Sequence, residues 1–247
     1  MLKRTMTAAA IAALMMLSTP AQSAQSDSMT KLRFAQKTKT PPSSVKDVDR
    51  NAKLADAASI NEDLIGFALD GKTDRVAEKV AAMRKAFTTL RPLLNDNIFE
   101  TLGRQVTEME QASFKNSVLD TALVAVEVYR TIENAMDGAL RPSPIEVAMM
   151  DYSGFKLSIL TAAQAADWAT IAATAKESDG YWSTLAKKVS DTSIRNLVGA
   201  IQDGLGAAVE RKDIYGVRFA AKMQLEIVDV LEQYFKGTFK THSEIAR

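Results

Sequence analysis

The sequence contains no cysteine and only one histidine among its 247 residues. Without cysteine, the chain forms no disulfide, binds no metal through thiolates and has no cysteine nucleophile. The single histidine, His242, lies in a polar stretch near the C-terminal end, whereas a Ser-His-Asp triad needs a histidine held in place by a second group. Zinc and Cu(II) sites also rely largely on histidine or cysteine. These absences disfavour the commonest hydrolytic and metal chemistries.

Familiar catalytic motifs are missing as well. The chain has no G-x-S-x-G, no glycine-rich phosphate loop and no H-E-x-x-H. Paired carboxylates act as acid and base in glycosidases, usually in a cleft lined with aromatic residues, but this sequence has only two tryptophans. We therefore expect a protein that is not an enzyme.

Neither sign of charge dominates. The chain has 31 basic and 30 acidic residues, and no block of five or six like charges occurs. Proteins that bind nucleic acid carry a basic stripe, and docking on anionic lipid needs a comparable basic cluster. The sequence therefore predicts no nucleic-acid partner.

The N-terminal residues are typical of a secretory signal peptide. Lys3 and Arg4 precede an apolar run of 12 residues, 6–17, and small polar residues follow as far as Ser23. This run is too short to span a bilayer comfortably, and no later apolar run reaches 18 residues. We expect cleavage after Ser23, or alternatively after Ala21, and a mature bacterial protein without an integral membrane segment in the periplasm or outside the cell. An uncleaved anchor is the alternative.

The remainder of the chain is predicted to be almost entirely helical. Residues 24–46 are polar and contain two adjacent prolines, which predicts a flexible lead-in, and residues 239–247 form a polar tail. Apolar periodicity predicts eight helices between them, near residues 48–70, 73–93, 96–113, 116–137, 144–163, 165–188, 191–211 and 213–236. The clearest break, 137–144, contains a glycine and two prolines, and it divides the chain into halves at 47–140 and 141–238.

A short pattern occurs once in each half. The sequences DLIGFAL (Asp63–Leu69) and DYSGFKL (Asp151–Leu157) both read Asp-x-x-Gly-Phe-x-Leu. We interpret the pattern as part of an internal duplication, although alanine-rich helices also resemble one another by composition. The predicted fold is all-α: an antiparallel helical bundle of two similar four-helix halves. Because an interior helical glycine is destabilising, Gly66 and Gly154 are each predicted to lie against a neighbouring helix.

Five polar residues are the candidates for a ligand site. Asp63 and Asp151 occupy the same place in the two copies, and Tyr152 follows the second. Glu127 and Arg130 lie on a polar line of the apolar helix 116–137. If that line faces inward, its charges must be paired or bound. The simpler interpretation is a solvated edge, with each Asp paired to a basic neighbour.

A metal site is a second hypothesis. Glu146, Met149 and Met150 share one helix face, and Asp63 and Asp151 could supply carboxylates from facing helices. Carboxylates suit a hard cation such as iron, whereas the methionine sulfurs, together with Met223, suit Cu(I). The simpler interpretation of the methionines is core packing.

These observations favour an exported, non-catalytic helical binding or accessory protein that takes a small ligand or a periplasmic protein partner and requires no cofactor. The alternative is a carboxylate/methionine carrier of iron or copper associated with uptake. An exposed apolar patch or a pocket would indicate the first.

Overall fold

A computed structural model of the chain describes residues 45–238, which are helical and contain no strand. The predicted signal peptide and C-terminal tail, and nearly all of the lead-in, lie outside the described residues. The eight predicted helices are confirmed, with ends shifted by a few residues, and two of them finish in short 3₁₀ turns. The α-helices are α1 (Val45–Leu69), α2 (Thr73–Leu90), α3 (Asp96–Phe114), α4 (Val118–Ala135), α5 (Ile145–Ala162), α6 (Trp168–Leu185), α7 (Thr192–Glu210) and α8 (Ile214–Phe235), and the 3₁₀ turns are η1 (Arg91–Leu93), η2 (Gly138–Leu140) and η3 (Ala186–Lys188). Within this part of the chain, no helix combines the length and apolar character needed to cross a membrane.

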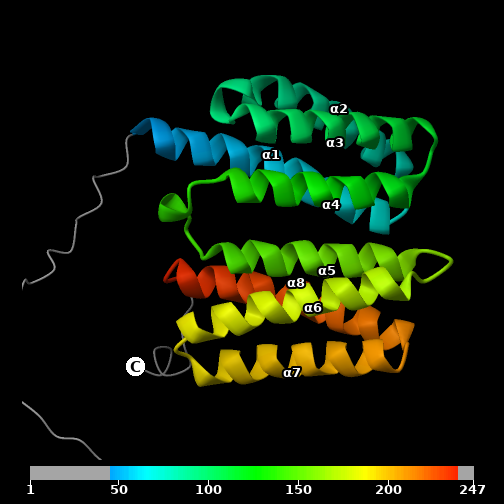
Figure 1. The fold of residues 1–247 in the computed structure, drawn as a ribbon, viewed down its shortest axis with the longest axis vertical. Helices are drawn as coiled ribbons and strands as arrows, with labels where there is room; N and C mark the ends of the chain where they lie inside the picture. The colour runs from blue at the N-terminus through cyan, green and yellow to red at the C-terminus, as the bar shows by residue number, and fades with distance from the viewer. Residues whose placement is uncertain (1–44, 239–247) are drawn as a thin grey trace, which may run out of the picture. The chain divides into compact units, whose positions relative to one another are not determined.

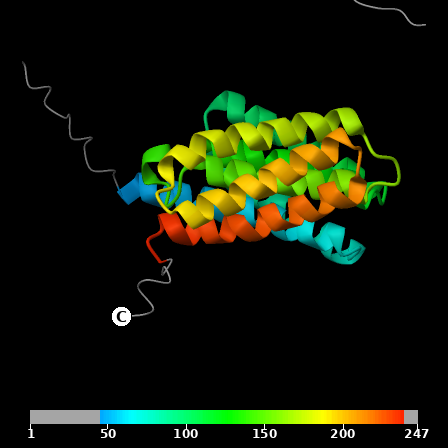
Figure 2. The same ribbon diagram turned by 90° about the horizontal axis from the view of Figure 1, so that it is seen from below.

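The contacts between helices divide the eight α-helices into two groups of four, and Figure 1 shows the two groups. In the first group, α1 and α3 each contact both α2 and α4. In the second, α5 and α7 each contact both α6 and α8. The groups meet mainly where α4 lies against α5, with a smaller contact between α1 and α5 (Figures 1 and 2).

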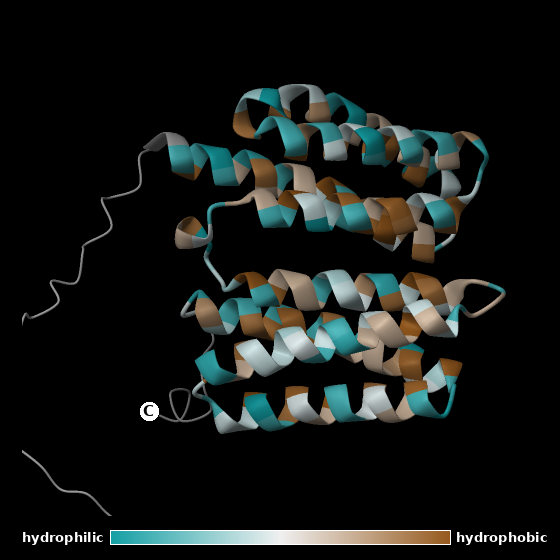
Figure 3. Ribbon diagram, viewed as in Figure 1, coloured by the Kyte–Doolittle hydropathy of each residue, from teal (hydrophilic) through white to brown (hydrophobic). Residues whose placement is uncertain are grey.

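Helix α5 is the most enclosed element of the fold. Apolar and polar residues alternate around most of the other helices (Figure 3), as expected for helices with one buried face. In α5, 11 of the 18 residues are buried. It contributes Tyr152 and Ile159 to the core of the first group, and Val147, Met150 and Leu157 to the cores of the second. Packing around α5 therefore joins the two groups.

The segment between the groups is held by side chains on both sides. The Asn51 side chain donates to the backbone oxygen of Asp137 at 3.0 Å and accepts from the Asp137 backbone nitrogen at 2.9 Å. The Arg141 guanidinium pairs with Glu133, with 2.7 Å between nitrogen and oxygen. The glycine- and proline-containing break seen in the sequence is thus fastened to α1 and α4.

The two glycines of the repeated pattern differ in their surroundings. A Cβ on Gly154 would lie 2.8 Å from Cδ2 of Leu225, so the predicted close approach of a neighbouring helix is confirmed between α5 and α8. The same prediction is wrong for Gly66, because a Cβ there would meet nothing within 4 Å. Helix α1 turns Leu64 and Ile65 inward, which leaves Gly66 on its exposed side.

Substitutions at these glycines should have opposite effects on stability. We expect Gly154→Val to lower the free energy of unfolding by about 1–3 kcal/mol, because its methyl groups must displace Leu225. Gly66→Ala should raise it by about 0.5–1 kcal/mol, because alanine favours the helix and has open space there. Urea unfolding measures both, with Gly66→Val as the size control. Equal losses at the two positions would contradict the close contact assigned to Gly154.

Candidate functional site

Three of the predicted ligand residues meet at the contact between α4 and α5. One carboxylate oxygen of Glu127 accepts from the Tyr152 hydroxyl at 2.9 Å and from Lys156 Nζ at 2.8 Å. The other carboxylate oxygen pairs with Arg130 at 2.5 Å, and the Arg130 guanidinium lies 4.8 Å from the centre of the Tyr152 ring. Lys156, which the sequence analysis did not select, completes this α4–α5 network.

The α4–α5 network satisfies its own polar groups. Lys156 Nζ also donates to the Tyr152 hydroxyl at 2.9 Å. Burial, followed by the charge of Glu127, raises the pKa of Tyr152, so the phenol remains a neutral donor at physiological pH. A fully paired network of this kind rigidifies the contact it spans. Its clearest role is to hold the two helix groups together.

The two repeated aspartates have different partners. The Asp63 side chain is 57% exposed and pairs with Lys79 of α2 at 2.7 Å. Asp151 is partly buried and accepts a hydrogen bond from the Tyr129 hydroxyl at 3.3 Å. The charge that acts most strongly on Asp151 is that of Glu62, the residue before Asp63.

Several carboxylates act on one another where α1, α4, α5 and α8 converge. Burial, followed by the charges of Glu133 and Glu232, raises the pKa of Glu62 to about 7. Burial, followed by the charge of Glu62, raises the pKa of Asp151 well above its usual range. Asp229 of α8 adds to both effects. We call these five residues the junction carboxylates: Glu62, Glu133, Asp151, Asp229 and Glu232. When Glu62 and Asp151 are protonated, the electrostatic repulsion among the junction carboxylates is smaller.

The remaining residues of the metal hypothesis are separately engaged. Glu146 pairs with Lys188 at 2.8 Å. Met149 and Met150 are buried, and Met150 belongs to an apolar core of the second helix group. Among residues 45–238, no group of three or more histidine or acidic side chains is placed to hold a metal ion. The metal site stays a prediction from the sequence.

A buried glutamine centres a second polar network that the sequence analysis missed. Gln224 Oε1 accepts from Ser178 Oγ at 2.8 Å and from Gln202 Nε2 at 3.0 Å. Its Nε2 donates to Ser153 Oγ at 2.8 Å and to the backbone oxygen of Met150. Helical spacing places Gln224 on the buried stripe of α8, between Ala220 and Val228 and away from the solvated polar residues, and this was the available sequence signal. The network links α5, α6, α7 and α8.

An apolar groove lies between α7 and α8, and we call it the α7–α8 groove. Its volume is about 370 Å³. Two of its side chains are strongly exposed, Leu197 at 53% and Phe219 at 67%. The lining consists of Leu197, Ala200, Ile201, Gly204, Ala208, Arg211, Gly216, Phe219, Ala220 and Met223.

The groove follows from the size of the residues on its two helices. On α7, the small residues Ala200, Gly204 and Ala208 recur at helical spacing and form one wall. On α8, the larger residues Phe219 and Met223 line the other side of the groove. Helical periodicity places Phe219 on the side of α8 away from its buried stripe. The sequence signal was therefore an apolar side chain outside the inward stripe.

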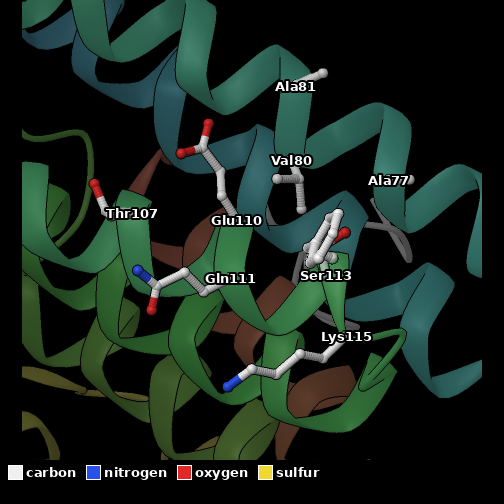
Figure 4. A pocket seen from close by; sticks show the side chains of 9 residues that line it. Ala77, Val80, Ala81, Thr107, Glu110, Gln111, Ser113 and Lys115 are labelled. Atoms are coloured by element: carbon white, nitrogen blue, oxygen red, sulfur yellow. The ribbon is translucent and has the colours of Figure 1, made fainter.

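Another groove lies between α2 and α3 (Figure 4) and has a volume of about 570 Å³. Val80 and Ala77 of α2 face the end of α3, where Phe114 is 89% exposed. Its lining is more polar than that of the α7–α8 groove. The Glu110 carboxylate in this lining already accepts a hydrogen bond from Arg84 at 2.6 Å. This groove therefore exposes less apolar surface to a ligand than the α7–α8 groove does.

No protein-family model, curated protein sequence or solved structure matches the chain.

The raised pKa of Glu62 should make stability depend on pH. Its pKa is 4.5 ordinarily and about 7 in the folded protein. Between these values the folded state keeps a proton that the unfolded state has lost, so the free energy of unfolding falls as pH rises from 4.5 to 7. Because Gln cannot ionise, we expect Glu62→Gln to stabilise the protein at pH 8 by up to about 3 kcal/mol more than at pH 4.

Urea unfolding of wild type and variant at both pH values measures this difference. Glu78→Gln, which changes an exposed carboxylate of α2, is the matched control for the loss of one carboxylate. An effect of Glu62→Gln that is equal at pH 4 and pH 8 would refute the assignment.

Proposed function

We propose that the protein is an exported, non-catalytic helical binding protein of the bacterial periplasm, and that it binds its ligand in the α7–α8 groove. The observation that carries this proposal is the exposure of Leu197 and Phe219 on either side of an apolar groove. Exposed apolar patches with concave shape are typical of binding sites. The signal-peptide pattern in residues 1–23 supports export.

We also propose that the two helix groups are an internal duplication, arranged as an antiparallel bundle. In chain order, α2, η1 and α3 have 18, 3 and 19 residues, and α6, η3 and α7 have the same lengths. A residue with positive φ precedes both α4 and α8, Asn116 at 56° and Lys212 at 51°. The same helix contacts recur in each group. Short loops between contacting helices support the antiparallel arrangement.

The duplication gives the α7–α8 groove an internal comparison. If Asn116 is matched to Lys212, each position of α7 and α8 lies 96 residues after its counterpart in α3 and α4. Four uncharged groove positions then correspond to polar ones in the first group, whereas Phe219 and Ala220 correspond to the apolar Leu123 and Val124. Leu197, Ile201, Gly204 and Met223 correspond to Thr101, Gln105, Glu108 and Glu127. Since this helix pair forms with polar residues at those four positions in the first group, their apolar character in the second is not a requirement of the fold, which supports a role in binding.

Filling the groove tests the proposal. Gly204 lines it and Gly206 lies on another side of α7, and a Cβ on either would meet nothing within 4 Å. We expect Gly204→Leu to weaken binding of the neutral apolar dye Nile red roughly tenfold, since about 50 Å² of apolar contact is lost. Fluorescence titration measures the affinity.

Gly206→Leu is the matched control, because it adds the same side chain to the same helix outside the groove. It should bind the dye as the wild type does. Equal affinities in both variants, or no dye binding by the wild type, would contradict the proposed site.

A further inference from the structure

The charge of the α7–α8 groove is concentrated at one end. Arg211, directly after α7, is the only charged residue of the lining. Its side chain is exposed and forms no ion pair or hydrogen bond within residues 45–238. The nearby Asp213 carboxylate accepts from the Gly216 backbone nitrogen at 3.0 Å and does not line the groove. The Arg211 guanidinium is therefore free to bind an anion, and its geometry suits a carboxylate.

The length of the groove matches one hydrocarbon chain. The lining of α7 runs from Leu197 to Ala208, which at 1.5 Å per residue is about 16 Å. The hydrocarbon core of a bilayer is about 30 Å thick and holds two layers of chains, so one acyl chain extends about 15 Å. The groove volume of about 370 Å³ lies in the range of small-molecule sites.

From these observations we propose that the α7–α8 groove binds a single-chain anionic amphiphile. The acyl chain lies along α7 and α8, and the carboxylate pairs with Arg211. One cation at the end of an otherwise uncharged lining matches a ligand that carries one charge at one end. This inference rests on the proposed function, because it names the ligand class for the same groove.

Chain length and head-group charge test the ligand class. Isothermal titration of the purified protein with octanoate, decanoate and dodecanoate, below their micelle concentrations, should show affinity rising roughly two- to fourfold per added methylene. Dodecyltrimethylammonium, with an alkyl chain one methylene longer and the opposite charge, should still bind at least about tenfold more weakly than dodecanoate. Equal affinity for the two head groups would overturn the inference.

Variants test the two ends of the groove separately. Arg211→Gln should weaken dodecanoate binding about tenfold and leave binding of neutral dodecanol unchanged, because only the charged contact is removed. Arg195→Gln is the matched control: it removes an arginine of α7 that contacts Thr192 and lies outside the lining. Gly204→Leu should weaken both ligands, whereas Gly206→Leu should weaken neither.

The outcomes separate this inference from the proposed function. If Nile red binds and Gly204→Leu weakens its binding, but dodecanoate and dodecyltrimethylammonium bind alike, the groove is a binding site and the anionic ligand is wrong. If neither dye nor amphiphile binds, both proposals fail. A dimer in light scattering that Phe219→Ser dissociates would also overturn the inference, because a second copy would then occupy the groove.

Discussion

The enclosure of α5 is the constraint on which the rest of the structure depends. One helix serves the cores of both helix groups, so it has almost no solvated face on which to place polar residues. Buried polar groups must find partners inside the protein. Tyr152 and Lys156 find theirs in Glu127 of α4, and Asp151 finds Tyr129. The close approach of α8 at Gly154 follows from the same enclosure.

If the two helix groups are matched by the proposed duplication, one pair of matched positions serves two purposes, at the junction between the groups and in the α7–α8 groove. In the first group, α4 meets a neighbouring helix, and the residue at the contact is Glu127, which is bound by α5. In the second group, the matched position on α8 is Met223, which faces the open groove. Both residues are half-buried, so the two positions differ in what they contact and not in how far they are covered. The charged residue is bound by Tyr152 and Lys156 of α5, whereas the apolar residue lines the groove.

Much of the fold could be predicted from the sequence because helices are local. Periodicity placed all eight helices, and the break at 137–144 separates the two groups. The predictions that were wrong depend on which face of a helix contacts a neighbouring helix. Gly66 and Gly154 have the same local sequence pattern, yet only Gly154 is covered, because only α5 is enclosed on that side. Likewise, the spacing on α4 brought Glu127 and Arg130 together, but no local pattern indicates that Phe219 and Leu197 border a shared groove.

The segment that follows α4 has a consequence for anyone who wishes to divide this protein. Its glycine and prolines make it look like an obvious place to cut the gene into two modules. Yet the Asn51 side chain, near the start of α1, forms hydrogen bonds with both the backbone nitrogen and the backbone oxygen of Asp137. Arg141 forms an ion pair with Glu133 of α4. A cut between residues 140 and 141 would remove the Arg141–Glu133 ion pair from the amino-terminal half, and a cut before Asp137 would remove the contacts of Asn51 as well.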